Sequence, residues 1–194
     1  MSKMQKFSKS KLRNHLPIGL YIHVPFCTIL CPFCDFYKKS WTPTLEKSYV
    51  DALIKEITCY KTTPPIPIET IFLGGGTPSI ISKTSLKKMI HAIHTTFDTE
   101  KIKEQCFEAN PEDITTKRLT EFKSNGFNRI SLGVQTFNES ECKQLGRGHT
   151  IQQSIDAIKT IQTHANWNLS IDLMFSLPNS TLDTLKQSLD QALS

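Results

Sequence analysis

The sequence predicts an α/β fold in which helices cover a parallel β-sheet. Five strand-like segments alternate with five segments of helical periodicity along the 194 residues. The cysteine-bearing, glycine-bearing and polar stretches all come directly after strands. Strict alternation favours parallel strands joined by right-handed crossovers. In such folds the carboxyl ends of the strands and the loops after them form the active face.

The N-terminal units are recognised from their periodicity and from the residues that interrupt it. An apolar strand over residues 19–24 is closed by Pro25. A helix over 44–60 has apolar residues at helical spacing, and the prolines after it break it. Residues 69–73 form the second strand, and Ser82 is the N-cap expected for the helix that follows. These segments make two complete strand–helix units.

The C-terminal units repeat this pattern. A strand over residues 103–109 precedes a helix over 115–124, which ends at an Asn-Gly pair. A strand over 129–134 precedes a helix that Gly146-Arg147-Gly148 divides into two halves. The fifth unit consists of a strand and a helix over residues 169–174 and 182–193.

The five units predict a single domain over residues 17–194 after a basic tail. Five units do not close an eight-unit barrel, so the sheet is either open or part of a barrel. The sequence stops at the end of a helix with no strand after it, and we expect C-terminal material to be missing. Residues 1–16 contain five basic residues, and a flexible solvated N-terminus is favoured over a nucleic-acid contact.

Composition restricts the class of protein. The net charge of +5 is concentrated in the tail, and no stripe of basic and aromatic residues follows, so nucleic acid is not an expected partner. There is no run of about 18 apolar residues and no signal-peptide pattern, so we expect no membrane span. The six cysteines lack the spacing of a secreted disulfide framework. A reducing cytoplasm is the expected compartment.

The cysteine-bearing stretch is the strongest chemical signal. Cys27, Cys31 and Cys34 have the spacing Cys-X3-Cys-X2-Cys, which allows three thiolates to reach three irons of one cubane cluster. The fourth iron then has no protein ligand, and substrate binds at such open positions. Structural zinc usually takes four ligands in two pairs, and no second pair follows. His23 or Cys59 could complete a zinc site, so zinc and unligated thiols remain alternatives.

The glycine-bearing loop is less specific. Gly74-Gly75-Gly76-Thr77-Pro78-Ser79 lacks the Lys-Ser/Thr ending of a phosphate-binding P-loop, and its spacing is not that of a dinucleotide fingerprint. It is either a tight turn or a stretch of bare backbone that the ammonium group of an amino acid could approach.

Polar residues end the remaining strands and break the fourth helix. Glu108, Gln135, Arg147 and Asp172 are the candidates at this face. We expect Asp172 to be a buried carboxylate, because apolar residues flank it in its strand, and such a group needs a partner. An ion pair between Asp172 and Arg147 is the purely structural alternative.

Taken together, these stretches resemble the radical S-adenosylmethionine (SAM) superfamily, whose hallmark is this cysteine triplet with an aromatic residue, here Phe33, before the third cysteine. More narrowly, the chain resembles the oxygen-independent coproporphyrinogen III oxidase group over residues 18–190. The similar stretches are Tyr-Ile-His-Val-Pro-Phe-Cys, the Gly-Gly-Gly-Thr-Pro-Ser loop, and residues 108–112, 131–135, 145–149 and 171–173.

This resemblance implies a fold, cofactors and contacts. The fold would be a partial (β/α)6 radical SAM barrel, truncated after the fifth unit and without its C-terminal domain. The cofactors would be a [4Fe–4S] cluster on Cys27, Cys31 and Cys34, and SAM, with an electron donor as partner. The implied SAM contacts are Tyr21, Phe33, Gly75, Gly76, Thr77, Glu108, Gln135, Arg147 and Asp172.

Phe36 distinguishes two subgroups within this resemblance. Oxidases of the group carry a fourth cysteine two places after the third, and Phe36 occupies that place here. The Cys34-Asp35-Phe36 form resembles the heme chaperone branch, which binds heme and passes it to an acceptor protein. Most of the heme site of that branch would lie beyond this chain. The alternative is the oxidase, with a porphyrinogen as substrate.

Overall fold

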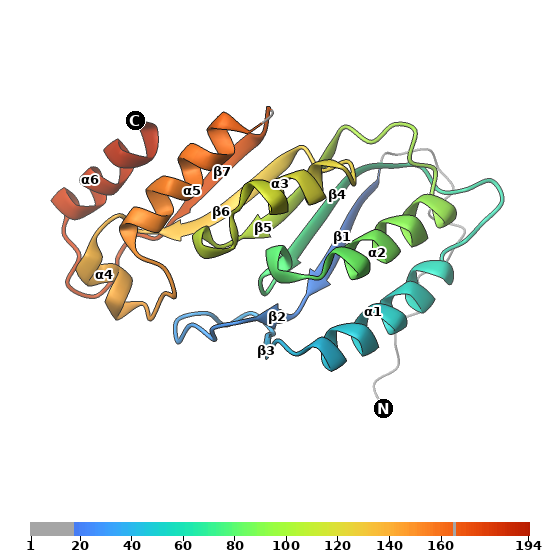
Figure 1. The fold of residues 1–194 in the computed structure, drawn as a ribbon, viewed down its shortest axis with the longest axis horizontal. Helices are drawn as coiled ribbons and strands as arrows, with labels where there is room; N and C mark the ends of the chain where they lie inside the picture. Colours follow the sequence, from blue (N-terminus) through green and yellow to red (C-terminus); the bar gives the residue numbers. More distant parts are fainter. Residues whose placement is uncertain (1–17, 165) are drawn as a thin grey trace.

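The fold is built on one five-stranded parallel sheet. The computed structural model describes residues 18–164 and 166–194, so the predicted tail over residues 1–16 lies outside the described residues. The strands follow one another across the sheet in chain order (Figure 1). They are β1 (Ile18–Val24), β4 (Ile68–Gly75), β5 (Glu104–Ala109), β6 (Arg129–Gln135) and β7 (Asn168–Leu173). An order without reversal is that of a barrel wall, which confirms the predicted α/β class.

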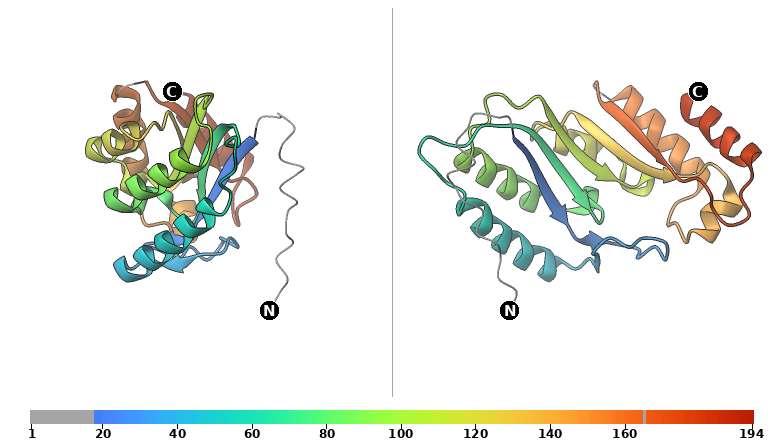
Figure 2. Two further views of the ribbon diagram at one scale, coloured as in Figure 1. Left: turned by 90° about the vertical axis from the view of Figure 1, so that its right-hand side faces the viewer. Right: turned by 180° about the vertical axis from the view of Figure 1, so that it is seen from behind.

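The helices lie together on one face of this sheet, and the other face is open (Figures 1 and 2). Their bounds are α1 (Pro43–Thr58), α2 (Lys83–Thr96), α3 (Thr116–Lys123), α4 (Glu139–Gln144), α5 (Ile151–Thr163) and α6 (Leu182–Leu193). The fourth predicted helix is thus two helices, as its glycines indicated. Within residues 18–164 and 166–194, no helix is long and apolar enough to cross a bilayer.

Side-chain caps fix where most helices begin. Ser82 accepts a hydrogen bond from the backbone N–H of Ser85, as its place in the sequence predicted. Thr42, Thr115, Thr150 and Thr181 do the same at α1, α3, α5 and α6. Each cap satisfies an N–H group that would otherwise lack an intrahelical partner.

The hydrophobic core fills the space between the sheet and the helices. In β6, Ile130, Leu132 and Val134 are fully buried, while the alternating residues are only partly buried. Phe107 of β5 stacks on Phe122 of α3 with ring centroids 3.7 Å apart. Because side chains alternate along a strand, the polar members of the strands are left on the open face.

A small parallel pair of two-residue strands, β2 (Phe26–Cys27) and β3 (Lys39–Ser40), was not predicted. Strands this short carry no periodicity. The backbone N–H of Trp41 donates to the carbonyl of Cys27 over 2.9 Å and helps close the loop. The pairing brings the two ends of the cysteine loop together at the carboxyl end of β1.

Candidate functional site

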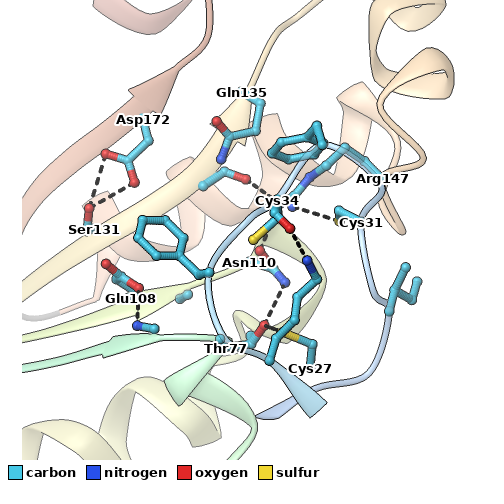
Figure 3. Close-up of a pocket in the computed structure, with 18 residues that line it drawn as sticks. Cys27, Cys31, Cys34, Thr77, Glu108, Asn110, Ser131, Gln135, Arg147 and Asp172 are labelled. Atoms are coloured by element: carbon cyan, nitrogen blue, oxygen red, sulfur yellow. Dashed lines mark hydrogen bonds between the residues drawn. The ribbon is translucent and has the colours of Figure 1, made fainter. Parts of the chain in front are cut away.

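A cavity of about 170 Å³ lies at the carboxyl ends of the strands (Figure 3). The loops after β1 and β4, together with β5, β6 and β7, all contribute to its wall, as predicted for the active face. It is lined by the three clustered cysteines and by all of the implied SAM contacts except Tyr21: Phe33, Gly75, Gly76, Thr77, Glu108, Gln135, Arg147 and Asp172.

The three cysteines are free thiols that surround this cavity. Cys27 is buried at β2, and its sulfur accepts a hydrogen bond from the Thr77 hydroxyl over 3.4 Å. Burial raises the pKa of the Cys27 thiol, and the neighbouring Cys34 and Cys31 add to the rise, while Thr77 and Lys38 oppose it. A bound metal would have to overcome this preference for the neutral thiol.

Two cations stand beside the cysteine loop. The ammonium of Lys38 donates to the carbonyl of Cys34, and Arg147 Nη1 donates to the sulfur of Cys31 over 3.5 Å. Within the described chain, no three His, Cys, Asp or Glu side chains converge on a position for a single metal ion. Three thiols around one cavity, with positive charge nearby, fit the donor chemistry of an anionic iron–sulfur cluster.

The glycine loop packs tightly against the cysteine loop. The N–H of Gly76 donates to the carbonyl of Val24 over 2.8 Å, and the N–H of Thr77 donates to that of Phe26 over 2.7 Å. A Cβ atom on Gly76 would lie 2.6 Å from the Phe26 carbonyl oxygen, so no side chain fits there. The glycine therefore allows Thr77 to reach the sulfur of Cys27.

Glu108 is a partly buried carboxylate on β5. Its Oε2 accepts a hydrogen bond from the Gly75 N–H over 2.9 Å. Burial raises the pKa of Glu108, and the Gly75 hydrogen bond only partly opposes this shift. Its neutral form is thus favoured more in the folded chain than in the unfolded one.

This shift predicts a pH-dependent stability difference between the cofactor-free protein and its Glu108→Gln variant. Because the pKa of Glu108 is higher in the folded chain, this residue stabilises the fold at pH values below its unfolded pKa of about 4.3. This stabilisation is lost as the pH rises through the pKa of the folded state. The Gln carbonyl still accepts from Gly75 and does not ionise. The stability of the variant relative to the wild type should therefore increase as the pH rises through this window. Urea unfolding between pH 4 and 8, at about unit intervals, measures this difference, and parallel pH profiles would contradict the assignment.

Gln135 and Arg147 approach the cavity from β6 and from the break between α4 and α5. Gln135 has a φ of 72°, in the left-handed region, at an irregularity in the pairing of β6 with β7. A non-glycine residue there costs about 1–2 kcal/mol, and such strain gathers at functional sites. Arg147 Nη2 donates to the Gly133 carbonyl over 2.6 Å and to Asn110 Oδ1 over 2.8 Å.

The expectation that Asp172 is buried was wrong, and the structural alternative, an ion pair with Arg147, is not formed in the described part of the chain. Asp172 is exposed, because it lies on the open face of β7, the outermost strand of the sheet. Its carboxylate accepts from the Ser131 hydroxyl over 3.0 Å, and in the described part of the chain it makes no ion pair with Arg147. A solvated carboxylate needs no buried counter-ion, so the reason for that pairing is absent.

Tyr21 is the one implied contact that does not line the cavity. Its ring stacks on Phe72 with centroids 6.0 Å apart, and its hydroxyl lies 3.1 Å from His23 Nδ1. Conversely, the cavity includes residues that were not assigned to it from the sequence: Ile29, Phe36, Lys38, Ala109, Asn110, Ser131 and Gly133. Asn110 directly follows β5, a position that could have suggested it.

Comparisons with known proteins agree with this geometry. Residues 21–192 match the family described as the radical SAM superfamily. The chain is 36% identical over 177 residues to the heme chaperone HemW of Lactococcus lactis, covering 91% of this chain and 46% of that protein. It is 38% identical over 177 residues to the heme chaperone HemW of Bacillus subtilis, covering 90% of this chain and 46% of that protein.

A solved structure shows the same fold. The coproporphyrinogen III oxidase HemN of Escherichia coli, described as a radical SAM enzyme, superposes with a TM-score of 0.85 at 25% identity. The match covers 95% of this chain and 43% of that one. The chain spans about half the length of the curated relatives that it matches. On the family match and these relatives, the chain belongs to the radical SAM superfamily.

Proposed function

We propose that the cavity holds a [4Fe–4S] cluster and SAM. Cys27, Cys31 and Cys34 would bind three irons, and the amino and carboxylate groups of SAM would bind the fourth. The observation that carries this proposal is that the three thiols and the polar ends of β5, β6 and β7 line one cavity. When bound, the cluster supplies the electron for reductive cleavage of SAM.

The side chains around the cavity suggest how SAM would be held. Backbone carbonyls of the Gly75 and Gly76 loop would accept from its ammonium group. Arg147, whose guanidinium already lies beside Cys31, would donate to its carboxylate as a charge-assisted partner. The carboxylates of Glu108 and Asp172 would accept from the ribose hydroxyls. The remaining proposed contacts are Tyr21, Phe33, Thr77 and Gln135.

We propose further that the protein is a heme chaperone, which binds heme and passes it to an acceptor protein. Phe36 supports this, because it lines the cavity where oxidases of the group carry a fourth cysteine. The heme chaperones of Lactococcus lactis and Bacillus subtilis support it as well. Since this chain spans about half of their length, the proposal includes that most heme contacts lie beyond these 194 residues. An electron donor would serve the cluster.

The second candidate is an oxygen-independent coproporphyrinogen III oxidase, which the structural similarity to the Escherichia coli oxidase favours. Such an enzyme would carry out an oxidative decarboxylation of two propionate side chains. The third, a zinc-stabilised binding module, rests only on the three thiols.

Anaerobic purification and titration distinguish these functions. A brown protein with about four irons per chain supports the cluster, whereas a colourless protein with one zinc supports the binding module. Heme is then titrated into the 194-residue chain and into a version extended to the length of its relatives, and transfer to an apo-globin is followed spectroscopically. Heme transfer without decarboxylation of coproporphyrinogen III is the expected result. Efficient decarboxylation would establish the oxidase instead.

A further inference from the structure

The segment between α4 and α5, residues 145–149, lies against the cysteine loop. A Cβ on Gly146 would contact the Pro32 ring at 3.1 Å, and one on Gly148 would meet Ile29 Cδ1 at 2.3 Å. The Gly146 carbonyl is 4.0 Å from the sulfur of Cys31. Any shift of this segment would therefore be transmitted to the loop that carries Cys31.

Arg147 depends on this segment for its position. Its guanidinium donates to the Cys31 sulfur, to the Gly133 carbonyl and to Asn110, none of which carries a carboxylate. Its Nε is buried and has no hydrogen-bond partner among residues 18–164 and 166–194. In the cofactor-free protein, a long side chain held by neutral acceptors has no strong ion pair to fix it, so its backbone must be fixed from elsewhere.

His149 and Glu112 provide such a fixed point. His149 Nδ1 lies 3.0 Å from Oε2 of Glu112. Glu112 belongs to the short 3-10 helix η3 (Pro111–Asp113), which lies across from the segment. The side chains are 0% and 20% exposed. Although burial opposes it, the hydrogen bond from His149 lowers the pKa of Glu112, and Arg147 adds to this effect. The lowered pKa favours an ionised Glu112, which can only accept, so we assign to His149 the tautomer that carries its hydrogen on Nδ1.

The second ring nitrogen of His149 indicates that packing alone does not explain a histidine at this position. In the described part of the chain, His149 Nε2 is buried without a hydrogen-bond partner, which costs about 1–3 kcal/mol that an aliphatic side chain would avoid. The backbone of His149 is held as well, because the Cys142 thiol donates to its carbonyl over 3.3 Å. The contribution of the ring lies in its bond to Glu112.

We propose that Glu112 and His149 are positioning residues that hold Arg147 against Cys31. The proposal rests on the proposed cluster but not on heme transfer. The positive charge of Arg147 beside a cysteine ligand stabilises the reduced, more negative form of the cluster. Releasing Arg147 should therefore shift the reduction potential of the cluster to more negative values.

A double-mutant cycle on the anaerobically reconstituted protein tests this. The midpoint potential is measured by titration followed by electron paramagnetic resonance. We expect His149→Leu and Arg147→Gln each to shift the potential to more negative values, and the double variant to shift it no further than Arg147→Gln alone. Additive shifts, or an unchanged potential in His149→Leu, would overturn the proposal.

Conservative variants separate positioning from folding. In His149→Asn the amide nitrogen replaces Nδ1 and should restore most of the potential, whereas Glu112→Leu, which has no acceptor for His149 Nδ1, should behave like His149→Leu. Affinity for SAM, measured by equilibrium dialysis, should fall about 10-fold in the two disrupted variants. His164→Leu, at the other end of α5, is the matched control and should change neither quantity. Equal effects of Asn and Leu at position 149 would contradict the proposed hydrogen bond.

These readouts are independent of the proposed function in heme transfer. Iron content and circular dichroism verify that each variant is folded and loaded before its potential is compared. Coupling between His149 and Arg147 in a protein that transfers no heme would refute the chaperone function alone. If the protein transfers heme but the shifts in midpoint potential of His149→Leu and Arg147→Gln are additive, only the positioning role of Glu112 and His149 is refuted.

Discussion

Cys31→Ala is expected to abolish assembly of the iron–sulfur cluster while leaving the sheet folded. Cys31 is half-buried in the loop between β2 and β3 and is not part of the hydrophobic core. Among the described residues, its sulfur hydrogen-bonds to Arg147, which lines the cavity, and to the Gly146 carbonyl. We therefore expect unfolding free energy to change by about 1 kcal/mol or less. Iron should fall from about four atoms per chain to a background level.

The measurement is iron and zinc per chain after anaerobic reconstitution, together with urea unfolding of the cofactor-free protein. Cys59→Ala is the matched control, because Cys59 is exposed at the end of α1 and far along the chain from the clustered thiols. It should keep the full complement of iron. Unchanged iron in Cys31→Ala would remove Cys31 from the ligands and with it the proposed cluster.

Much of the fold could be predicted because its signals are local. The strand over residues 129–134 alternates buried and half-buried residues, and the helix over 182–193 begins and ends where predicted. Proline, glycine and capping residues marked the ends of the elements. The paired strands β2 and β3 could not be predicted, since each has two residues and depends on the other for its hydrogen bonds.

The residues of the site that come directly after strands could be predicted. Contacts between side chains of different strands or distant segments could not. The carboxyl ends of parallel strands meet, so the order of residues along the chain was enough to group Glu108 and Gln135 with the cysteines. The partner of Asp172 could not be predicted, because it depends on the register of β6 and β7. That register pairs Ser131 with Ser170 and brings the Ser131 hydroxyl diagonally to Asp172, two residues further along β7. The pairing of Glu112 with His149 joins segments 37 residues apart, and nothing in the local sequence indicates it.

Gly76→Ala is expected to disable the cavity through the backbone rather than through a lost side chain. The added Cβ would lie 2.6 Å and 2.8 Å from the oxygen and nitrogen of Phe26 and 2.9 Å from the Val24 oxygen. All three are main-chain atoms of β1 and β2, so they cannot rotate away. The glycine loop must separate from the cysteine loop, which breaks the hydrogen bonds from Gly76 and Thr77.

Overpacking of this kind costs about 1–3 kcal/mol, and a clash with backbone belongs at the upper end of that range. If about half of that cost is present only in the SAM-bound state, the affinity for SAM should fall about 10-fold. Equilibrium dialysis with SAM and urea unfolding measure the two effects. Gly19→Ala is the control, because Gly19 lies at the opposite end of β1. Among the described residues, its Cβ would meet the hydroxyl of Thr70 on β4, which belongs to a movable side chain. A Gly76→Ala variant that matches Gly19→Ala in both measurements would mean that the contact between the two loops does not support the site.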